Sequence, residues 1–453
     1  MTISAKLKRL AGDTAVKAIY GKGISALVIK VASAGTSYLM LVAFANLLSP
    51  EDYGYFGYIL NLSILLSALF GLGLPTAIMR FWPTHMERAE PALARGAVKV
   101  SLLALAAATA LLTLLGVLLS LMGIMSAELG FAGAWIATAL LAATFAFGDY
   151  LSGALRAQGN TIWALAPRDI FWRVAAPLLA ISVLYTTGIS DARTAILSCL
   201  AVMVIVCVAQ IYKHIQLTRM LAGKGTTQVD WKAWTKPLLP LWWSGVLYAL
   251  IQQFDVIVVG TLLGPAEAGA YFAAQKTASL LGLVMIAGGM VAAPMMAASF
   301  HAGRMAELQR LCRLLAIAIA VSTLAGLVLM AVLGNLLLTI FDPTYVSAYG
   351  VLMVLSFGFA VDAMAGPSAY LMQMTKLEWT YLRIMAVVYG LVLALQVTFV
   401  PRYGILAAAA ASAFGVVIWN VLAIHLLRKE IGIDPSILSA LWPPKSLPQD
   451  NAS

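Results

Sequence analysis

Long apolar stretches alternate with short polar segments along almost the whole chain. Most of these stretches are long enough to cross the hydrocarbon core of a bilayer as an α-helix, which takes about 20 residues. The segments between them contain Gly, Pro and charged residues, which are typical of the ends of membrane helices. The pattern predicts twelve spanning helices, at residues 24–48, 57–79, 100–122, 132–155, 174–187, 195–212, 237–262, 271–297, 314–338, 346–373, 384–400 and 404–427.

The composition agrees with this pattern and excludes a soluble globular protein. Of 453 residues, 62% are apolar and only 11% are charged, and the mean hydropathy is +0.92. Soluble domains are close to half apolar and a quarter charged. Twelve spans leave no room for a sizeable soluble domain, so we predict an all-α, polytopic membrane protein. The three cysteines and four histidines have no metal-ligand spacing, so we expect neither a metal nor a cofactor.

The net charge of +10 is explained by its distribution along the chain. If the N terminus is cytoplasmic, 25 of the 29 Lys and Arg residues fall in cytoplasmic segments, two in outer connections and two within spans. This bias places both termini in the cytoplasm. Because the positive charge records orientation, we do not expect nucleic acid as a partner. We expect residues 1–23, which are basic and amphipathic, to lie on the anionic membrane lipid.

Two pairs of short motifs repeat at the same offset of 215 residues. Leu48–Gly54 after the first span resembles Leu263–Gly269 after the seventh, and Ala154–Gln158 resembles Ala369–Gln373. This indicates a six-plus-six duplication with parallel halves. The predicted organisation is a cytoplasmic lead-in, a first bundle, a cytoplasmic linker, a second bundle and a cytoplasmic tail, at residues 1–23, 24–220, 221–236, 237–427 and 428–453.

Two prolines in equivalent spans are candidates for hinges. Pro75 and Pro294 lie towards the inner ends of the second and eighth spans, and each follows a glycine-containing stretch. Glycine and proline permit bending in a membrane helix, which a rocking transporter can use. Membrane helices also tolerate these residues for packing alone, and the sequence does not decide between the two roles.

Charged side chains inside membrane spans cost at least about 2.5 to 3.5 kcal/mol each on insertion scales, so they are candidates for function. Three carboxylates are candidates for ion coupling or gating: Asp149, Asp255 and Asp362. Five cations, within spans or near their ends, are candidates for binding an anionic substrate in a cavity: Lys30, Arg80, Arg156, Arg173 and Lys276.

Each of these charges also has a structural interpretation. The lysine of the first span can extend to the inner surface, and the arginines can simply follow the positive-inside rule. Asp149 can reach across two turns to Arg156, which follows the end of the predicted fourth span. Asp255 can form an ion pair with Lys276, and Asp362 can contact another helix through a polar interaction.

Four motifs in order along the chain carry a resemblance to a known family. They are residues 48–56 (LSPEDYGYF), residues 154–160 (ALRAQGN), Phe254-Asp255 followed by Gly260, and residues 400–408 (VPRYGILAA). Together they resemble the polysaccharide transporter branch of the multidrug/oligosaccharidyl-lipid/polysaccharide (MOP) exporter superfamily, which includes Wzx-type O-antigen flippases. The resemblance covers about residues 20–433, and Ala407-Ala408 departs from the Gly-Ala pair expected there.

The resemblance implies two six-helix bundles around a central cavity that opens alternately to each side. It implies a flippase of the bacterial cell inner membrane that moves an undecaprenyl-diphosphate-linked oligosaccharide to the outer leaflet for polysaccharide or lipopolysaccharide biosynthesis. The implied partners are the lipid-linked glycan, membrane lipid and other polysaccharide-assembly proteins.

Two other classes of function compete with a flippase. A MATE-like drug or cation antiporter of the same superfamily would favour acidic residues in its cavity, and the spans contain three acids against two lysines, which separates the two transporters only weakly. A polytopic enzyme of the same pathway would need catalytic acids, commonly on a long loop. The sequence has no long outer connection, Asp-x-Asp pair or His-Glu-x-x-His motif, so we expect no enzyme and assign no catalytic residue.

Overall fold

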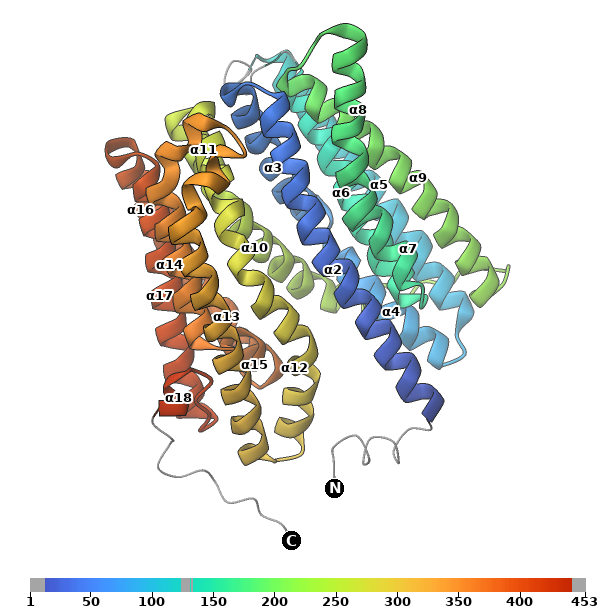
Figure 1. Cartoon of the computed structure of the whole chain (residues 1–453). Helices are drawn as coiled ribbons and strands as arrows, with labels where there is room; N and C mark the ends of the chain where they lie inside the picture. Colours follow the sequence, from blue (N-terminus) through green and yellow to red (C-terminus); the bar gives the residue numbers. More distant parts are fainter. Residues whose placement is uncertain (1–12, 124–130, 132, 442–453) are drawn as a thin grey trace. The chain divides into compact units, whose positions relative to one another are not determined.

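The computed structural model describes residues 13–123, 131 and 133–441, and every regular element in this part of the chain is a helix (Figure 1). The elements of the first half are α2 (Asp13–Leu47), α3 (Pro50–Phe70), α4 (Leu74–Glu87), α5 (Pro91–Leu121), α6 (Ala134–Ala157), α7 (Thr161–Ala166), η1 (Pro167–Phe171), α8 (Trp172–Thr187) and α9 (Ala192–Ala222). The elements of the second half are α10 (Trp231–Leu263), α11 (Pro265–Ser279), η2 (Leu280–Gly282), α12 (Leu283–His301), α13 (Met305–Thr339), η3 (Pro343–Ala348), α14 (Tyr349–Ala365), α15 (Ser368–Met374), α16 (Glu378–Tyr403), α17 (Ile405–Glu430) and α18 (Leu438–Leu441).

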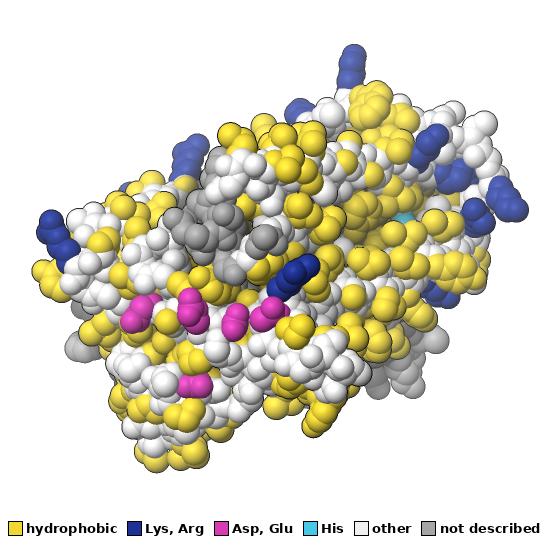
Figure 2. Space-filling view, turned by 90° about the horizontal axis from the view of Figure 1, so that it is seen from above, with side chains coloured by type: hydrophobic (Ala, Val, Ile, Leu, Met, Phe, Trp, Pro, Cys, Tyr) yellow, Lys and Arg dark blue, Asp and Glu magenta, His cyan; other side chains and the backbone are white. Residues whose placement is uncertain are grey.

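Ten helical segments of the described chain are long and apolar enough to cross a membrane. They overlap with ten of the twelve predicted spans, although the segment Pro50–Phe70 begins and ends earlier than the predicted 57–79. The other two predicted spans correspond to α2 and to α11 with α12. Large apolar side chains remain exposed along these helices, such as Leu103 and Leu121 on α5. The face seen from above in Figure 2 shows hydrophobic side chains together with Asp, Glu, Lys and Arg. An apolar outer surface is suited to lipid. The prediction of an all-α, multi-pass membrane protein is confirmed. The first part of the basic lead-in, residues 1–12, lies outside the described residues.

Three predicted spans are broken in the structure, and the tenth, 346–373, is interrupted at Gly366 and Pro367, between α14 and α15. The second span divides into α3 and α4 at a turn in which Leu72 and Gly73 both have a positive φ, of 52° and 68°. Pro75 then occupies the first turn of α4, where its missing N–H costs no helical hydrogen bond. The eighth span is broken at η2, whereas Pro294 lies further along, inside α12. One hinge candidate therefore adjoins a break and the other does not, and a hinge role for either stays a prediction.

The described chain divides into two compact units. The first contains residues 13–40, 62–123 and most of 131–246. In this unit α6 packs against α4, α5 and α9. Small side chains permit the close approach: a Cβ atom at Gly153 on α6 would lie 2.4 Å from the carbonyl oxygen of Pro75.

The second unit contains residues 41–61 and 247–441 of the described chain. Here α14 and α16 pack against α17, and α13 packs against α14. The core is apolar and includes Trp419, Val392 and Leu371. This packing places the few polar groups of the unit among buried hydrophobic side chains.

The first pair of repeated motifs meets within this second unit. A Cβ atom at Gly54 would lie 1.7 Å from the carbonyl oxygen of Pro265, so the backbones of the two motifs are in contact. The hydroxyls of Tyr58 and Thr261 are 3.1 Å apart. Tyr53 is fully buried, and its ring is 5.9 Å from that of Phe272. The motifs that suggested a repeat therefore include helix-packing residues.

Candidate functional site

A π-helical turn sets up a cluster of charges in the first unit. The sequence predicted a loop at residues 156–173, but α7, η1 and α8 form one helical segment from Thr161 to Thr187, long enough to span the membrane. Asn160 caps its start by accepting a hydrogen bond from the Trp163 N–H at 3.3 Å. Pro167 begins the π-helical turn, and such turns are frequent at functional sites. The predicted start of the fifth span, at residue 174, was too late.

Asp169 is the centre of this cluster. Its side chain is 1% exposed, and its carboxylate accepts hydrogen bonds from Lys30 Nζ at 2.6 Å and from Arg168 Nη1 at 2.8 Å. Lys30 comes from α2, so this ion pair joins the first span to the π-helical turn. A buried carboxylate is stabilised only when cations and hydrogen bonds replace its water, which this arrangement provides.

Arginines extend the cluster on either side of Asp169. Arg168 also donates to the carboxylate of Asp149 on α6, and this is the ion pair that the structure shows for Asp149. Arg173 donates to the carbonyl oxygen of Asp169 at 2.5 Å and to Ser33 on α2. Arg156, which we considered as the partner of Asp149, donates instead to the carbonyl oxygen of Ser152 at 3.2 Å.

The cluster carries more positive than negative charge. The cations are Lys30, Arg156, Arg168 and Arg173, and the carboxylates are Asp149 and Asp169. Two positive charges therefore remain in excess. Among the described contacts, Lys30 uses one of its three donors and Arg156 one of its five, and both side chains keep solvent exposure. The cluster can therefore bind an anion with about two negative charges, which would neutralise the positive charge that the two carboxylates leave.

Asp255 is a buried carboxylate of the second unit. It accepts hydrogen bonds from Gln396 Nε2 at 2.8 Å, from Ser412 Oγ at 2.9 Å and from the Tyr271 hydroxyl at 3.0 Å. These partners come from α16, α17 and α11, and all are neutral. Lys276 Nζ lies 5.3 Å from the centroid of the Phe272 ring. Neutral donors can support a carboxylate that exchanges a small cation or a proton.

Asp362 on α14 has a different environment. Its carboxylate accepts a hydrogen bond from Asn420 Nδ2 at 2.8 Å, which confirms a polar contact with another helix, α17. The Trp419 indole also donates to it, and Tyr370 and Tyr381 interact with it electrostatically. Arg80 lies exposed on α4 and takes no part in the hydrogen bonds of the charge cluster.

Sequence reasoning missed several residues of these sites. Neither Arg168 nor Asp169 was a candidate, because both were placed in a segment between two predicted spans. The signal was present: residues 161–187 are apolar enough to span, with Pro167 inside. Gln396 and Ser412 carry no pattern that would single them out, since neutral polar residues are common in membrane helices.

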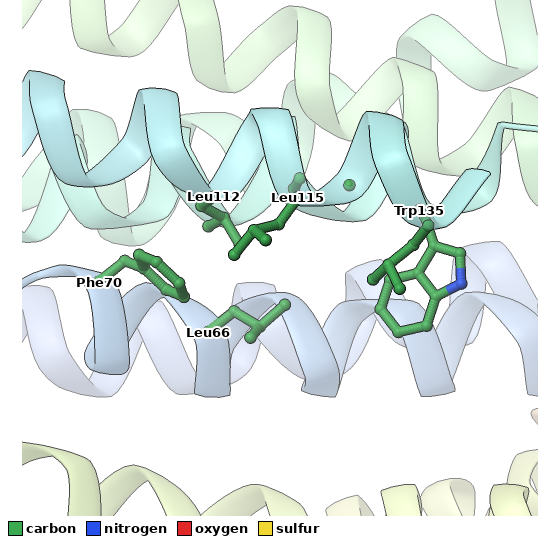
Figure 3. Close-up of a pocket in the computed structure, with 8 residues that line it drawn as sticks. Leu66, Phe70, Leu112, Leu115 and Trp135 are labelled. Atoms are coloured by element: carbon green, nitrogen blue, oxygen red, sulfur yellow. The ribbon is translucent and has the colours of Figure 1, made fainter. Parts of the chain in front are cut away.

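A small recess of about 120 Å³ lies between α3, α5 and α6 (Figure 3). Leu66, Phe70, Leu112, Leu115 and Trp135 are among the side chains around it. The recess has no charged lining residue, so it offers nothing to hold a phosphate or an ion.

Comparison with known proteins assigns the chain to a family. Residues 20–300 match the model of a family described as polysaccharide biosynthesis protein. The chain belongs to the polysaccharide biosynthesis protein family. No curated protein matches the sequence, so the family assignment rests on the match over these residues.

Solved structures show that this family member has the fold of MOP superfamily transporters. A multidrug resistance MATE transporter of the MOP superfamily, in an inward-facing conformation, has a TM-score of 0.68 at 14% identity, over 90% of this chain and 98% of that chain. The lipid II flippase MurJ, in an inward closed conformation, has a TM-score of 0.67 at 14% identity, over 89% and 87%. A MOP superfamily transporter from Pyrococcus furiosus, for which reverse polarity of the binding pocket is taken to suggest a different function, has a TM-score of 0.59 at 15% identity, over 92% and 96%. All three are transporters or flippases.

Proposed function

We propose that this protein is a flippase that moves an undecaprenyl-diphosphate-linked oligosaccharide across the bacterial inner membrane by alternating access. The observation that carries the proposal is the charge cluster of the first unit, with two positive charges in excess within a membrane-spanning region. A diphosphate diester carries a negative charge on each phosphate at neutral pH, so it matches this excess. Membership of the polysaccharide biosynthesis family and the fold of a lipid II flippase support the glycolipid as substrate.

In this proposal Lys30 and Arg156 receive the diphosphate. Both retain donors and exposure, whereas Arg168 and Arg173 are already held by Asp149, Asp169 and Ser33. The two carboxylates keep the cluster compact when the substrate is absent. When the diphosphate arrives, it can take over donors from Asp169 without leaving a buried charge unpaired.

We assign Asp255 to energy coupling. Its position among Gln396, Ser412 and Tyr271 lets it hold a proton or a sodium ion, and two of its amide neighbours, Gln396 and Gln275, have buried side-chain oxygens without a hydrogen-bond partner in the described chain. Buried acceptors that lack a donor are costly unless a cation or water occupies the space between them. We further propose that both termini are cytoplasmic and that the two halves form separate six-helix bundles.

Export in a deletion strain tests the function. Loss of the gene should leave lipid-linked oligosaccharide on the inner face and remove surface polysaccharide. Lys30→Gln with Arg156→Gln should fail to restore export at normal membrane abundance, while Lys224→Gln, an exposed lysine of the linker, should restore it. Normal surface polysaccharide in the deletion strain, in the absence of a second copy of the gene, would refute the flippase.

A drug or cation antiporter is the second candidate. The MATE transporter is as similar in fold as the flippase, and Asp255 and Asp362 have neutral hydrogen-bond partners, which suits a cationic ligand. Resistance to cationic dyes that depends on both carboxylates, with normal polysaccharide export in the deletion strain, would favour this function.

A further inference from the structure

A set of aromatic side chains lies near Asp362 in the second unit, and one of them, Tyr389, also interacts electrostatically with Asp255. Tyr370, Tyr381 and Tyr389 all interact electrostatically with the Asp362 carboxylate, and Tyr248 interacts with two of these three tyrosines. The three tyrosines come from α15 and α16, and Tyr248 comes from α10, so side chains of three helices gather near the carboxylate that α14 carries.

Packing holds several of these aromatic rings in place. Tyr381 meets Trp419 edge to face, with ring centroids 5.3 Å apart and an interplanar angle of 84°. Tyr370 lies against Gly289 on α12, where a Cβ atom would come within 2.2 Å of the tyrosine ring. The glycine therefore leaves the space that the ring occupies. Tyr248 is 64% exposed, so the set is buried on one side and open on the other.

Asp362 is oriented within this aromatic set. Asn420, which is 2% exposed, donates to one carboxylate oxygen at 2.8 Å, and the Trp419 indole supports the same carboxylate. The result is an acid held among tyrosine hydroxyls, with no cation among the described groups that act on it. A carboxylate and phenol groups exposed to lipid would be costly, so this surface is suited to a polar ligand.

We propose that Asp362, Asn420, Tyr248, Tyr370 and Tyr381 form a carbohydrate subsite that binds a sugar ring of the lipid-linked glycan. Aromatic faces stack on the apolar C–H face of a pyranose, while the carboxylate accepts hydrogen bonds from neighbouring hydroxyls and phenols both donate and accept. This inference rests on the proposed function.

Equilibrium binding in lipid nanodiscs tests the subsite. The probes are undecaprenyl diphosphate, which has no sugar, and the lipid-linked oligosaccharide purified from the deletion strain. The wild type should bind the glycan-bearing probe at least about tenfold more tightly, and Tyr248→Ala and Asp362→Asn should each lose about tenfold for that probe alone. Tyr403→Ala, an exposed tyrosine on α16, is the matched control and should behave as the wild type.

The outcomes separate this inference from the function on which it rests. Equal weakening of both probes by Tyr248→Ala, or no change in either, would overturn the subsite. Tight binding of tetraphenylphosphonium that is lost in these variants, with unchanged binding of the glycan, would overturn it in favour of an aromatic cation site. If the wild type binds neither lipid probe, the proposed function itself fails. Nanodiscs hold no ion gradient. If Asp362 acts in ion coupling alone, Asp362→Asn will keep the preference for the glycan-bearing probe, and that result would overturn the subsite.

Discussion

The ion pair between Lys30 and Asp169 gives a quantitative test of the charge cluster. Asp169→Asn removes the carboxylate that binds both Lys30 at 2.6 Å and Arg168 at 2.8 Å, and the side chain is 1% exposed. Loss of one partner from a buried pair costs about 3 to 5 kcal/mol. Lys30→Gln should cost no more than about 1 kcal/mol, because the lysine side chain is 41% exposed and Asp169 keeps Arg168.

The double variant Lys30→Gln with Asp169→Asn completes a double-mutant cycle. A neutral amide pair can hydrogen-bond across the same gap, so the double variant should be more stable than the sum of the single changes predicts. For residues in direct contact the coupling energy is about 0.5 to 3 kcal/mol, and we expect a value in the lower part of this range, about 0.5 to 1.5 kcal/mol, because Lys30 is 41% exposed.

Unfolding of the purified protein in SDS, followed by tryptophan fluorescence, measures the four free energies. Lys224→Gln serves as the control for removing a lysine charge, since this lysine is exposed in the linker. A coupling energy below about 0.5 kcal/mol, or an Asp169→Asn variant as stable as the wild type, would refute the buried ion pair.

Two further changes test packing and a buried hydrogen-bond chain. Gly54→Ala should reduce membrane abundance severalfold on immunoblots, because its Cβ would lie 1.7 Å from the Pro265 carbonyl oxygen, while Gly390→Ala, with no atom within 4 Å, should not. Trp234→Phe should lower the thermal stability in detergent by about 1 kcal/mol, because it removes the indole N–H that donates to His85 Nε2 at 3.1 Å. Equal abundance of both glycine variants, or an unchanged melting temperature for the tryptophan variant, would contradict these expectations.

The positions of the spans followed from the sequence because their determinant is local. A stretch of about 20 apolar residues must lie in lipid whatever its neighbours are, and its backbone must then form a helix. The exception is instructive. Residues 161–173 contain Arg168, Asp169 and Arg173, which suggested a loop, yet the structure continues the helix through them. A charged residue can stay inside a membrane helix when an oppositely charged partner stabilises it, and the sequence does not show which residue is that partner.

The chemistry of the candidate sites was predicted in part. Lys30, Asp149, Asp255 and Asp362 were singled out because a charge inside a span is costly, a property of each residue alone. Their partners were not predicted. Lys30 bonds with Asp169, 139 residues away in sequence, and Asp255 bonds with Gln396, 141 residues away.

The sequence by itself determined the membrane class, the helices and the residues whose charge needed an explanation, because each depends on the transfer of short segments from water to lipid. Only the tertiary structure decided which charges neutralise one another. Helix packing and the π-helical turn at Pro167 bring Asp169 against α2, and they leave two cations in excess there. Hydrogen bonds reach only about 3 Å, so their pattern depends on the register of packed helices, which a hydropathy pattern does not contain.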